Sequence, residues 1–178
     1  MEIGYPPAPI NWSSQVTIRP LEYEDLPALE WEGEYTHFRK LYSEAYRRVQ
    51  LGLSMVWVAD LPGVGILGQA LVQLVCDRLE LADGVDRAYV YAFRVRQKYR
   101  SGGLGSRIMG VVEEDLIRRG FNTVTLNVAR ENPRARQLYE RLGYHVAADE
   151  PGIWSYQDHL GNWHQVNEPA WCMEKRLV

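Results

Sequence analysis

The sequence predicts an α+β protein, an αβα sandwich in which helices cover both faces of one central sheet. Seven short runs rich in β-branched and aromatic residues are interleaved with segments whose apolar residues recur every three or four positions. The chain has 178 residues, the size of one domain with a full hydrophobic core. The strands are expected at residues 16–20, 55–59, 66–75, 88–95, 122–128, 144–146 and 171–177.

The helices are expected between these strands. The strongest signal is Asn132 followed by Pro133, a capping residue and a proline in the first helical turn. Residues 76–86 and 147–168 are polar or lack a periodic pattern, so we expect irregular structure there. The helices are predicted to open near Glu24, to span residues 36–51, to run from residue 104 to about 119, and to run from residue 132 to 143.

Composition places the protein among ordinary globular domains, with 24% charged and 46% hydrophobic residues. Residues 1–14 hold three prolines and two adjacent serines, which indicates a flexible N-terminal arm before a single domain at 15–178. The arm has no basic region followed by an apolar run, so it does not read as a signal peptide. Cys76 and Cys172 do not form a disulfide framework, and we expect a cytoplasmic protein with free thiols.

The charge of the chain is unevenly distributed, although the net charge is only −3. Residues 94–141 contain eleven Lys or Arg and five Asp or Glu, a balance of +6. The rest of the chain has nine basic and eighteen acidic residues, a balance of −9. This asymmetry favours an anionic cofactor on one side and, more weakly, a cationic substrate on the other; differing solvated helix faces are the alternative.

The central strand, residues 88–95, leads directly into a glycine-rich turn and a helix. Its odd positions, Tyr89, Tyr91 and Phe93, are expected to form one aromatic face. A helix start has unpaired backbone N–H groups and partial positive charge, and glycines before it let an anion approach. The pattern therefore predicts a phosphate-binding turn, with a ligand-free turn as the alternative.

Two common phosphate-binding motifs are excluded at this turn. A P-loop requires a Lys after its second glycine, and none follows Gly105. A dinucleotide fingerprint requires a third glycine where Ile108 stands. What remains is Arg100, two residues, Gly103, one residue and Gly105, which resembles the Arg/Gln-x-x-Gly-x-Gly/Ala signature of the GNAT superfamily of N-acetyltransferases.

A second region, residues 126–144, strengthens this resemblance because it lies at the expected distance downstream. After a strand it has Asn132, two residues and Ala135, and then Leu138-Tyr139, two residues and Leu142-Gly143-Tyr144. The resemblance covers the element order from Thr17 to Leu177 and is weakest at residues 1–14, 76–86 and 147–170. It implies a GNAT-type mixed, mostly antiparallel sheet of about seven strands that is splayed between the fourth and fifth.

The resemblance also implies that acetyl-CoA lies at this splay and leaves as coenzyme A. Its pantetheine arm would pair with the backbone of the central strand, and its pyrophosphate would bind the amides of the turn. Asn132 would bond the cofactor arm, and Tyr139 would lie near the sulfur. The cofactor-binding residues implied are Phe93, Arg94, Val95, Arg100, Ser101, Gly102, Gly103, Leu104, Gly105, Ser106, Asn132 and Tyr139.

Tyr139 is the catalytic candidate, as a proton donor to the leaving thiolate, and a core aromatic is the alternative for it. The general base is missing, because residues 88–95 contain no carboxylate. A water chain ending at Tyr89 or Tyr91, or a carboxylate near the second helix, could replace it. These carboxylates are Glu30, Glu32 and Glu34. As bases, His37, His159 and His164 have no supporting pattern. No His or Cys spacing suggests a metal.

The sequence thus predicts an N-acetyltransferase that moves acetyl from acetyl-CoA to a primary amine by direct attack in a ternary complex. A non-catalytic acyl-CoA-binding or sensor domain is the alternative, and nucleic-acid binding ranks last. Small-molecule and peptide amines both remain open, a membrane partner is not expected, and a homodimer is open. The acceptor is predicted to be a cationic amine with aromatic or apolar bulk, bound by Trp31, Glu34, Tyr89, Tyr91 and Trp154.

Overall fold

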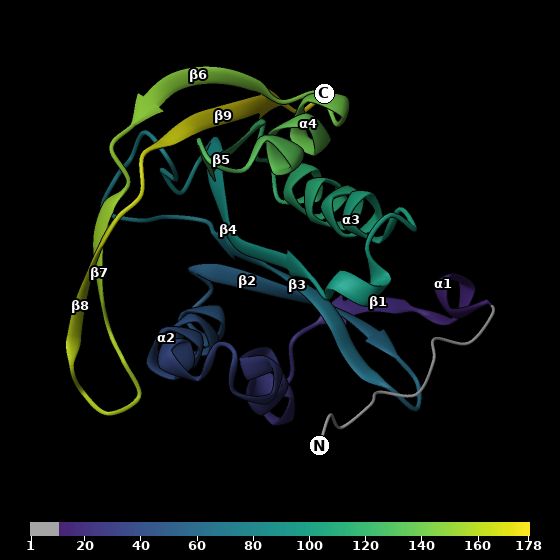
Figure 1. Ribbon diagram of the computed structural model, residues 1–178. Coiled ribbons are helices and arrows are strands. Elements are labelled where there is room, and N and C mark those ends of the chain that lie inside the picture. Colours follow the sequence, from purple (N-terminus) through teal and green to yellow (C-terminus); the bar gives the residue numbers. More distant parts are fainter. Residues whose placement is uncertain (1–10) are drawn as a thin grey trace.

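The protein, seen here as a computed structural model that describes residues 11–178, is built on a seven-stranded sheet (Figure 1). The strand order is β1-β2-β3-β4-β5-β9-β6, and β4 with β5 is the parallel pair among antiparallel ones. The predicted mixed, mostly antiparallel sheet is therefore confirmed. The strands are β1 (Thr17–Pro20), β2 (Ser54–Leu61), β3 (Gly65–Gln73), β4 (Arg87–Val95), β5 (Thr123–Ala129), β6 (His145–Glu150) and β9 (Ala170–Arg176).

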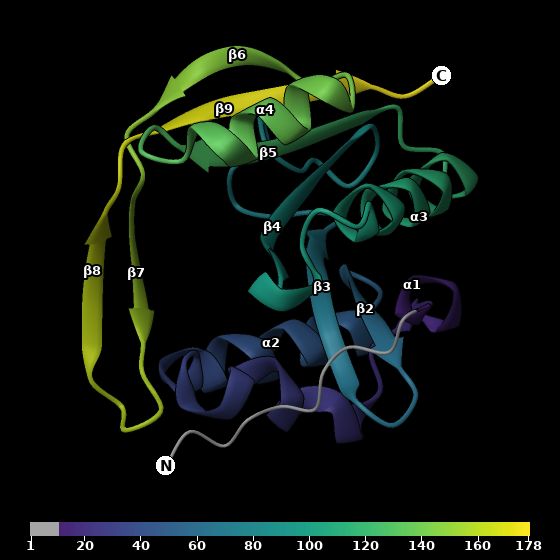
Figure 2. The same cartoon turned by 45° about the vertical axis from the view of Figure 1, so that its right-hand side comes forward.

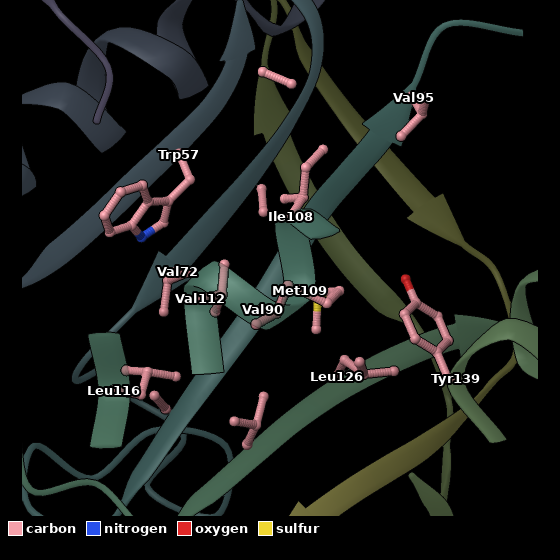
Figure 3. Close-up of a cluster of buried hydrophobic side chains, with 14 of the residues drawn as sticks. Trp57, Val72, Val90, Val95, Ile108, Met109, Val112, Leu116, Leu126 and Tyr139 are labelled. Carbon is pink, nitrogen blue, oxygen red and sulfur yellow. The ribbon is translucent and has the colours of Figure 1, made fainter. Parts of the chain in front are cut away.

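Helices cover the two faces of the sheet (Figure 2). Helix α3 (Leu104–Arg118) turns an apolar stripe toward Val90 and Leu126, as Figure 3 shows for the core. The other face is covered by α2 (Arg39–Gln50), preceded by the 3-10 segments η1 (Tyr23–Gly33) and η2 (Thr36–Phe38). The last helix, α4 (Pro133–Arg141), follows β5 on the α3 side. The buried residues of the α3 stripe are Leu104, Ile108, Met109, Val112 and Leu116.

The parallel pairing between β4 and β5 ends halfway along β4. It runs from Arg87 opposite Thr123 to Val90 opposite Leu126. Beyond that point β5 continues to pair with β9 as far as Ala129, and β4 continues to pair with β3. Among residues 11–178, the edges of β4 and β5 that face each other beyond Val90 thus lack ladder partners, which confirms the predicted splay.

A bulge in β4 changes which side chains share a face. Ala92 has a φ of +48°, and the register with β3 shifts between Gln69 and Leu71. The Gln69 amide donates a hydrogen bond to the Ala92 carbonyl at 3.3 Å. Tyr91 consequently packs on the α2 side, whereas Phe93 packs on the α3 side. The expected aromatic face of Tyr89, Tyr91 and Phe93 was wrong, because a bulge inverts the alternation.

The region expected to be irregular, residues 147–168, contains a β-hairpin. Strands β7 (Ile153–Gln157) and β8 (Trp163–Asn167) form a separate antiparallel pair that reaches from the ends of β6 and β9 to the α2 layer (Figure 1). Its turn is closed by the Asp158 carboxylate, which accepts hydrogen bonds from the amides of Leu160 and Asn162. The hairpin was missed because most of its residues are exposed, so no alternation of apolar and polar residues marks it.

The part of the predicted N-terminal arm that the structure describes forms a short helix, α1 (Trp12–Gln15). Trp12 packs edge-on against Tyr99, with ring centres 5.0 Å apart. The Arg107 guanidinium binds the carbonyls of Ser13 and Val16. The first ten residues of the arm lie outside the described residues. No helix within residues 11–178 has the length and hydropathy needed to cross a membrane.

Candidate active site

The glycine-rich turn follows a short 3-10 segment, η3 (Gln97–Tyr99), and leads into α3. Ser101 and Gly103 have φ values of +68° and +78°, and Gly102 between them does not have a positive φ. A backbone that alternates in handedness in this way can direct successive N–H groups toward one anion. Within residues 11–178, no backbone carbonyl accepts from the amides of residues 101–103, and those of 104–106 open the helix. The Arg100 amide differs, because it donates to the Gln97 carbonyl at 3.2 Å.

Two arginines hold the turn in place. The Nε of Arg100 donates to the Val95 carbonyl at 2.8 Å, so this carbonyl at the end of β4 is already engaged. The guanidinium of Arg134, in the first turn of α4, donates to the Ser101 hydroxyl at 3.0 Å. Arg134 was missed from sequence. The available signal was a cation in the first turn of a helix, where the helix dipole disfavours positive charge unless an anion is nearby.

The turn fits a diphosphate group. A side-chain carbon at Gly103 would meet no atom of residues 11–178 within 4 Å, so this position is open next to the amides of the turn. A carbon at Gly105 would lie 3.2 Å from the Phe93 ring, and one at Gly102 would lie 2.9 Å from Trp12. A larger residue at Gly103 would project beside the turn amides, and one at Gly102 or Gly105 would press on Trp12 or Phe93.

Asn132 begins α4 as predicted. Its side-chain oxygen accepts from the Ala135 amide at 3.1 Å, and Pro133 occupies the first helical position. Its side-chain nitrogen has no acceptor among the residues that the structure describes. The cap therefore leaves a donor for a ligand at the α4 end of the gap in strand pairing.

Tyr139 is buried, with 7% of its surface exposed, beside Phe93 and Tyr144. Its hydroxyl, which Figure 3 shows directed away from α4, makes no hydrogen bond within residues 11–178. The neighbouring Tyr144 instead donates to Glu113 at 3.0 Å. Burial, with a smaller contribution from Tyr89, raises the pKa of Tyr139 above its ordinary value. The phenol therefore stays protonated near neutral pH and has a free donor.

Asn127 is a site residue that sequence reasoning missed. It is the first residue of β5 beyond the last pair with β4, and its amide nitrogen lies 3.4 Å from the Tyr89 hydroxyl. Its side-chain oxygen is buried and has no partner within residues 11–178. Buried polar atoms are normally satisfied, so this oxygen points to a missing donor. A polar residue between Leu126 and Val128 in a buried strand was the available signal.

Tyr89 and Tyr91 lie side by side, with parallel rings 5.7 Å apart. Burial raises the pKa of each phenol to about 12, and a side-chain hydrogen bond offsets only part of this increase. Neither phenol can act as a base near neutral pH. They can donate or relay a proton through hydroxyl groups that stay neutral.

The other acceptor-site candidates lie near η1 and the hairpin. Trp31 is buried against Tyr35, with ring centres 5.3 Å apart, whereas Glu34 is exposed. Tyr35 stacks on Phe38, which in turn stacks on Trp154 of β7 at 6.1 Å. The structure thus connects Trp31 to Trp154 through two aromatic residues that sequence analysis had not selected.

Two of the three carboxylates considered as bases, Glu30 and Glu32, are ion-paired, and the third, Glu34, is exposed. Glu30 binds Arg39 at 2.9 Å, and Glu32 binds Arg96 at 2.8 Å. The Arg39 hydrogen bonds keep the pKa of Glu30 below its usual range. His164 binds Asp158 at 2.7 Å in the hairpin. Within residues 11–178 no group of His, Cys, Asp and Glu could hold a metal ion.

These features define a protein with a glycine-rich turn at a helix start and polar groups at a split parallel strand pair. The chain belongs to the acetyltransferase (GNAT) family, whose model matches residues 20–144. The recognition made from sequence is confirmed.

Similar proteins agree with this family. The probable N-acetyltransferase camello of Xenopus tropicalis is 28% identical over 130 residues, which are 67% of this chain and 55% of that protein. The chain therefore spans about half the length of this relative. The Escherichia coli ribosomal-protein-S18-alanine N-acetyltransferase has a TM-score of 0.68 at 24% identity, with 92% and 94% of the two chains covered. Arabidopsis thaliana NAA60 in complex with acetyl-CoA has a TM-score of 0.66 at 18% identity, with 91% and 98% covered.

Proposed function

We propose that this chain is an acetyl-CoA-dependent N-acetyltransferase that acetylates a primary amine by direct attack in a ternary complex. The observation that carries the proposal is the pair of unpartnered polar atoms beside the split strands, the Tyr139 hydroxyl and the Asn127 side-chain oxygen. The Tyr139 hydroxyl can donate a hydrogen bond to the leaving thiolate, and the Asn127 oxygen can accept one from the attacking amine. Amine acetylation benefits from both interactions.

The cofactor is held by the groups that the fold leaves unpaired. The amides of residues 101–106 and the Arg134 guanidinium bind the diphosphate, and the Asn132 amide nitrogen binds the arm. Backbone groups of Phe93 and Arg94 on the unpaired edge of β4 extend along the arm as an added strand would. When bound, acetyl-CoA supplies an activated acetyl thioester.

In the transfer the amine nitrogen forms a bond to the acetyl carbon, and the carbon–sulfur bond breaks. An amide N–H on the unpaired edge of β4 binds the carbonyl oxygen as charge builds on it. The Asn127 oxygen accepts a hydrogen bond from the amine, and the Tyr89 hydroxyl passes the lost proton toward solvent. Tyr139 keeps its own proton and donates a hydrogen bond to the leaving thiolate.

The test is incubation of the protein with acetyl-CoA and a panel of primary amines. We expect release of free thiol matched by acetylated amine in the mass spectrum. Absence of both cofactor binding and turnover would contradict the proposal.

A second candidate is a non-catalytic acyl-CoA-binding or sensor domain. It is favoured by the lack of a carboxylate on β4 and by the ion-pairing of Glu30 and Glu32. It predicts tight cofactor binding without amine turnover. For either candidate we propose a cytoplasmic location, supported by the free thiols of Cys76 and Cys172, and a single domain at 15–178.

A further inference from the structure

Arg94 lies beside the proposed site and has no anionic partner among the residues that the structure describes. Its guanidinium carbon lies 4.0 Å from the centre of the Tyr35 ring and 5.5 Å from that of Phe38. One of its nitrogens donates to the Tyr42 hydroxyl at 2.9 Å. No carboxylate within residues 11–178 lies close enough to pair with it. Arg94 is partly buried, and a partly desolvated charge favours an opposite charge nearby.

Two of the three acidic residues in the 30–34 segment are paired with other arginines. The negative charges of Glu30 and Glu32 are cancelled, because Arg39 pairs with Glu30 and Arg96 pairs with Glu32. The remaining member, Glu34, is exposed. Within residues 11–178, Arg94 therefore keeps a positive charge that no carboxylate of this region pairs.

Arg94 also lies in the right part of the fold to contact an acceptor. It is two residues beyond the Ala92 bulge, and its side chain is on the α2 face of β4. Tyr35 and Phe38, on which it lies, continue through stacked rings to Trp154 of the hairpin. The rings of Tyr35, Phe38 and Trp154 therefore form a stacked aromatic row that begins at the Arg94 guanidinium.

The chemistry of a stacked guanidinium allows it to bind a carboxylate. Arg has five N–H donors in one plane, and its guanidinium lies over the Tyr35 ring. When a guanidinium and a ring stack face to face, the donors at the edges of the guanidinium stay available. The hydrogen bond to Tyr42 uses one donor. The remaining edge can hold a carboxylate through two parallel hydrogen bonds.

We propose that Arg94 is a specificity-determining residue that binds a carboxylate of the acceptor. The acceptor is then an amine that also has a carboxylate and an aromatic or apolar body, such as an amino acid or a short peptide. This inference rests on the proposed function, and it replaces the cationic acceptor expected from the sequence. If Arg94 only supports Tyr42 and Tyr35, its replacement changes stability without changing acceptor preference.

The test compares L-phenylalanine with L-phenylalaninamide, which differ in the carboxylate. Binding of each is measured by calorimetry to the protein saturated with coenzyme A, so that turnover is not required. We expect the wild type to bind phenylalanine at least about tenfold more tightly than the amide, because a charge-assisted pair is worth at least that factor. Arg94→Gln removes the difference, and Arg94→Lys retains part of it.

Arg47→Gln is the matched control, because it makes the same change in charge at an exposed residue near the end of α2 that pairs with Glu44. It should leave the preference unchanged. Coenzyme A binding by each variant verifies that it is folded. Equal or weaker binding of phenylalanine in the wild type, a preference that survives in Arg94→Gln, or no binding of either compound overturns the inference. Acetylation of other amines would then still support the proposed function.

Discussion

The amide nitrogen of Asn127 lies 3.4 Å from the hydroxyl of Tyr89, at the first position of β5 beyond its pairing with β4. These two residues therefore bracket the point where the strands part. The other end of the Asn127 amide, its oxygen, is buried without a partner. Asn127 cannot titrate, so its role in the proposed reaction is to orient the amine.

This role predicts a separation of activity from stability in Asn127→Leu. Leucine has the same branching as asparagine and needs no hydrogen-bond partner, so we expect unfolding free energy to stay within about 1 kcal/mol of wild type or to rise. The kcat/KM for the amine should fall by about tenfold or more, with acetyl-CoA affinity unchanged. Steady-state kinetics and denaturant unfolding measure the two effects.

Thr125→Val in the same strand is the control. The Thr125 hydroxyl is buried and bonds the Leu81 carbonyl at 2.7 Å, so its loss should cost about 1–3 kcal/mol of stability and leave kcat near wild type. Equal effects of both variants on stability and none on rate would remove Asn127 from the mechanism.

Tyr139→Phe tests the unpartnered hydroxyl. Phenylalanine keeps the packing against Phe93 and Tyr144 and removes only the donor. We expect kcat to fall by about 10- to 100-fold, while the Kd for acetyl-CoA stays near wild type. Tyr144→Phe, which removes a hydroxyl bound to Glu113, should leave kcat unchanged. An unaltered rate in Tyr139→Phe would assign Tyr139 to the core alone.

Gly103→Val tests the diphosphate-binding turn. A β-branched side chain at a φ of +78° is strained, and it would project into the open space beside the turn amides. Coenzyme A affinity measured by calorimetry should fall by at least about tenfold. Gly110→Ala lies at an exposed position of α3 with ordinary φ, so it should keep the affinity and gain about 0.5–1 kcal/mol of stability. Retained affinity in Gly103→Val would place the phosphates elsewhere.

The raised pKa of Tyr139 predicts that the rate does not fall at mildly alkaline pH. The proposed role needs the protonated phenol, and a pKa above the ordinary value of about 10 keeps that form present throughout the neutral and mildly alkaline range. We therefore expect kcat/KM to rise between pH 6 and pH 9, roughly, as the acceptor amine loses its proton, without a descending limb there. A descending limb in this range that disappears in Tyr139→Phe would contradict the assignment.

Local signals made much of the fold predictable. The Asn132 cap, the glycine turn and the strand periodicities depend on neighbouring residues, and the structure has a helix, a turn or a strand at each. The Ala92 bulge was not predictable, because it is supported by Gln69 from another strand. The unpartnered oxygen of Asn127 depends on where two distant strands separate, and the isolation of Arg94 depends on which arginines pair with Glu30 and Glu32.

The most direct measurement for the central claim is a crystal structure of the protein with acetyl-CoA. We expect diphosphate oxygens within hydrogen-bond distance of the amides of residues 101–106, and a pantetheine arm along the unpaired edge of β4 beyond Val90. Acetyl-CoA bound at another surface, with this turn and strand edge free of it, would contradict the account.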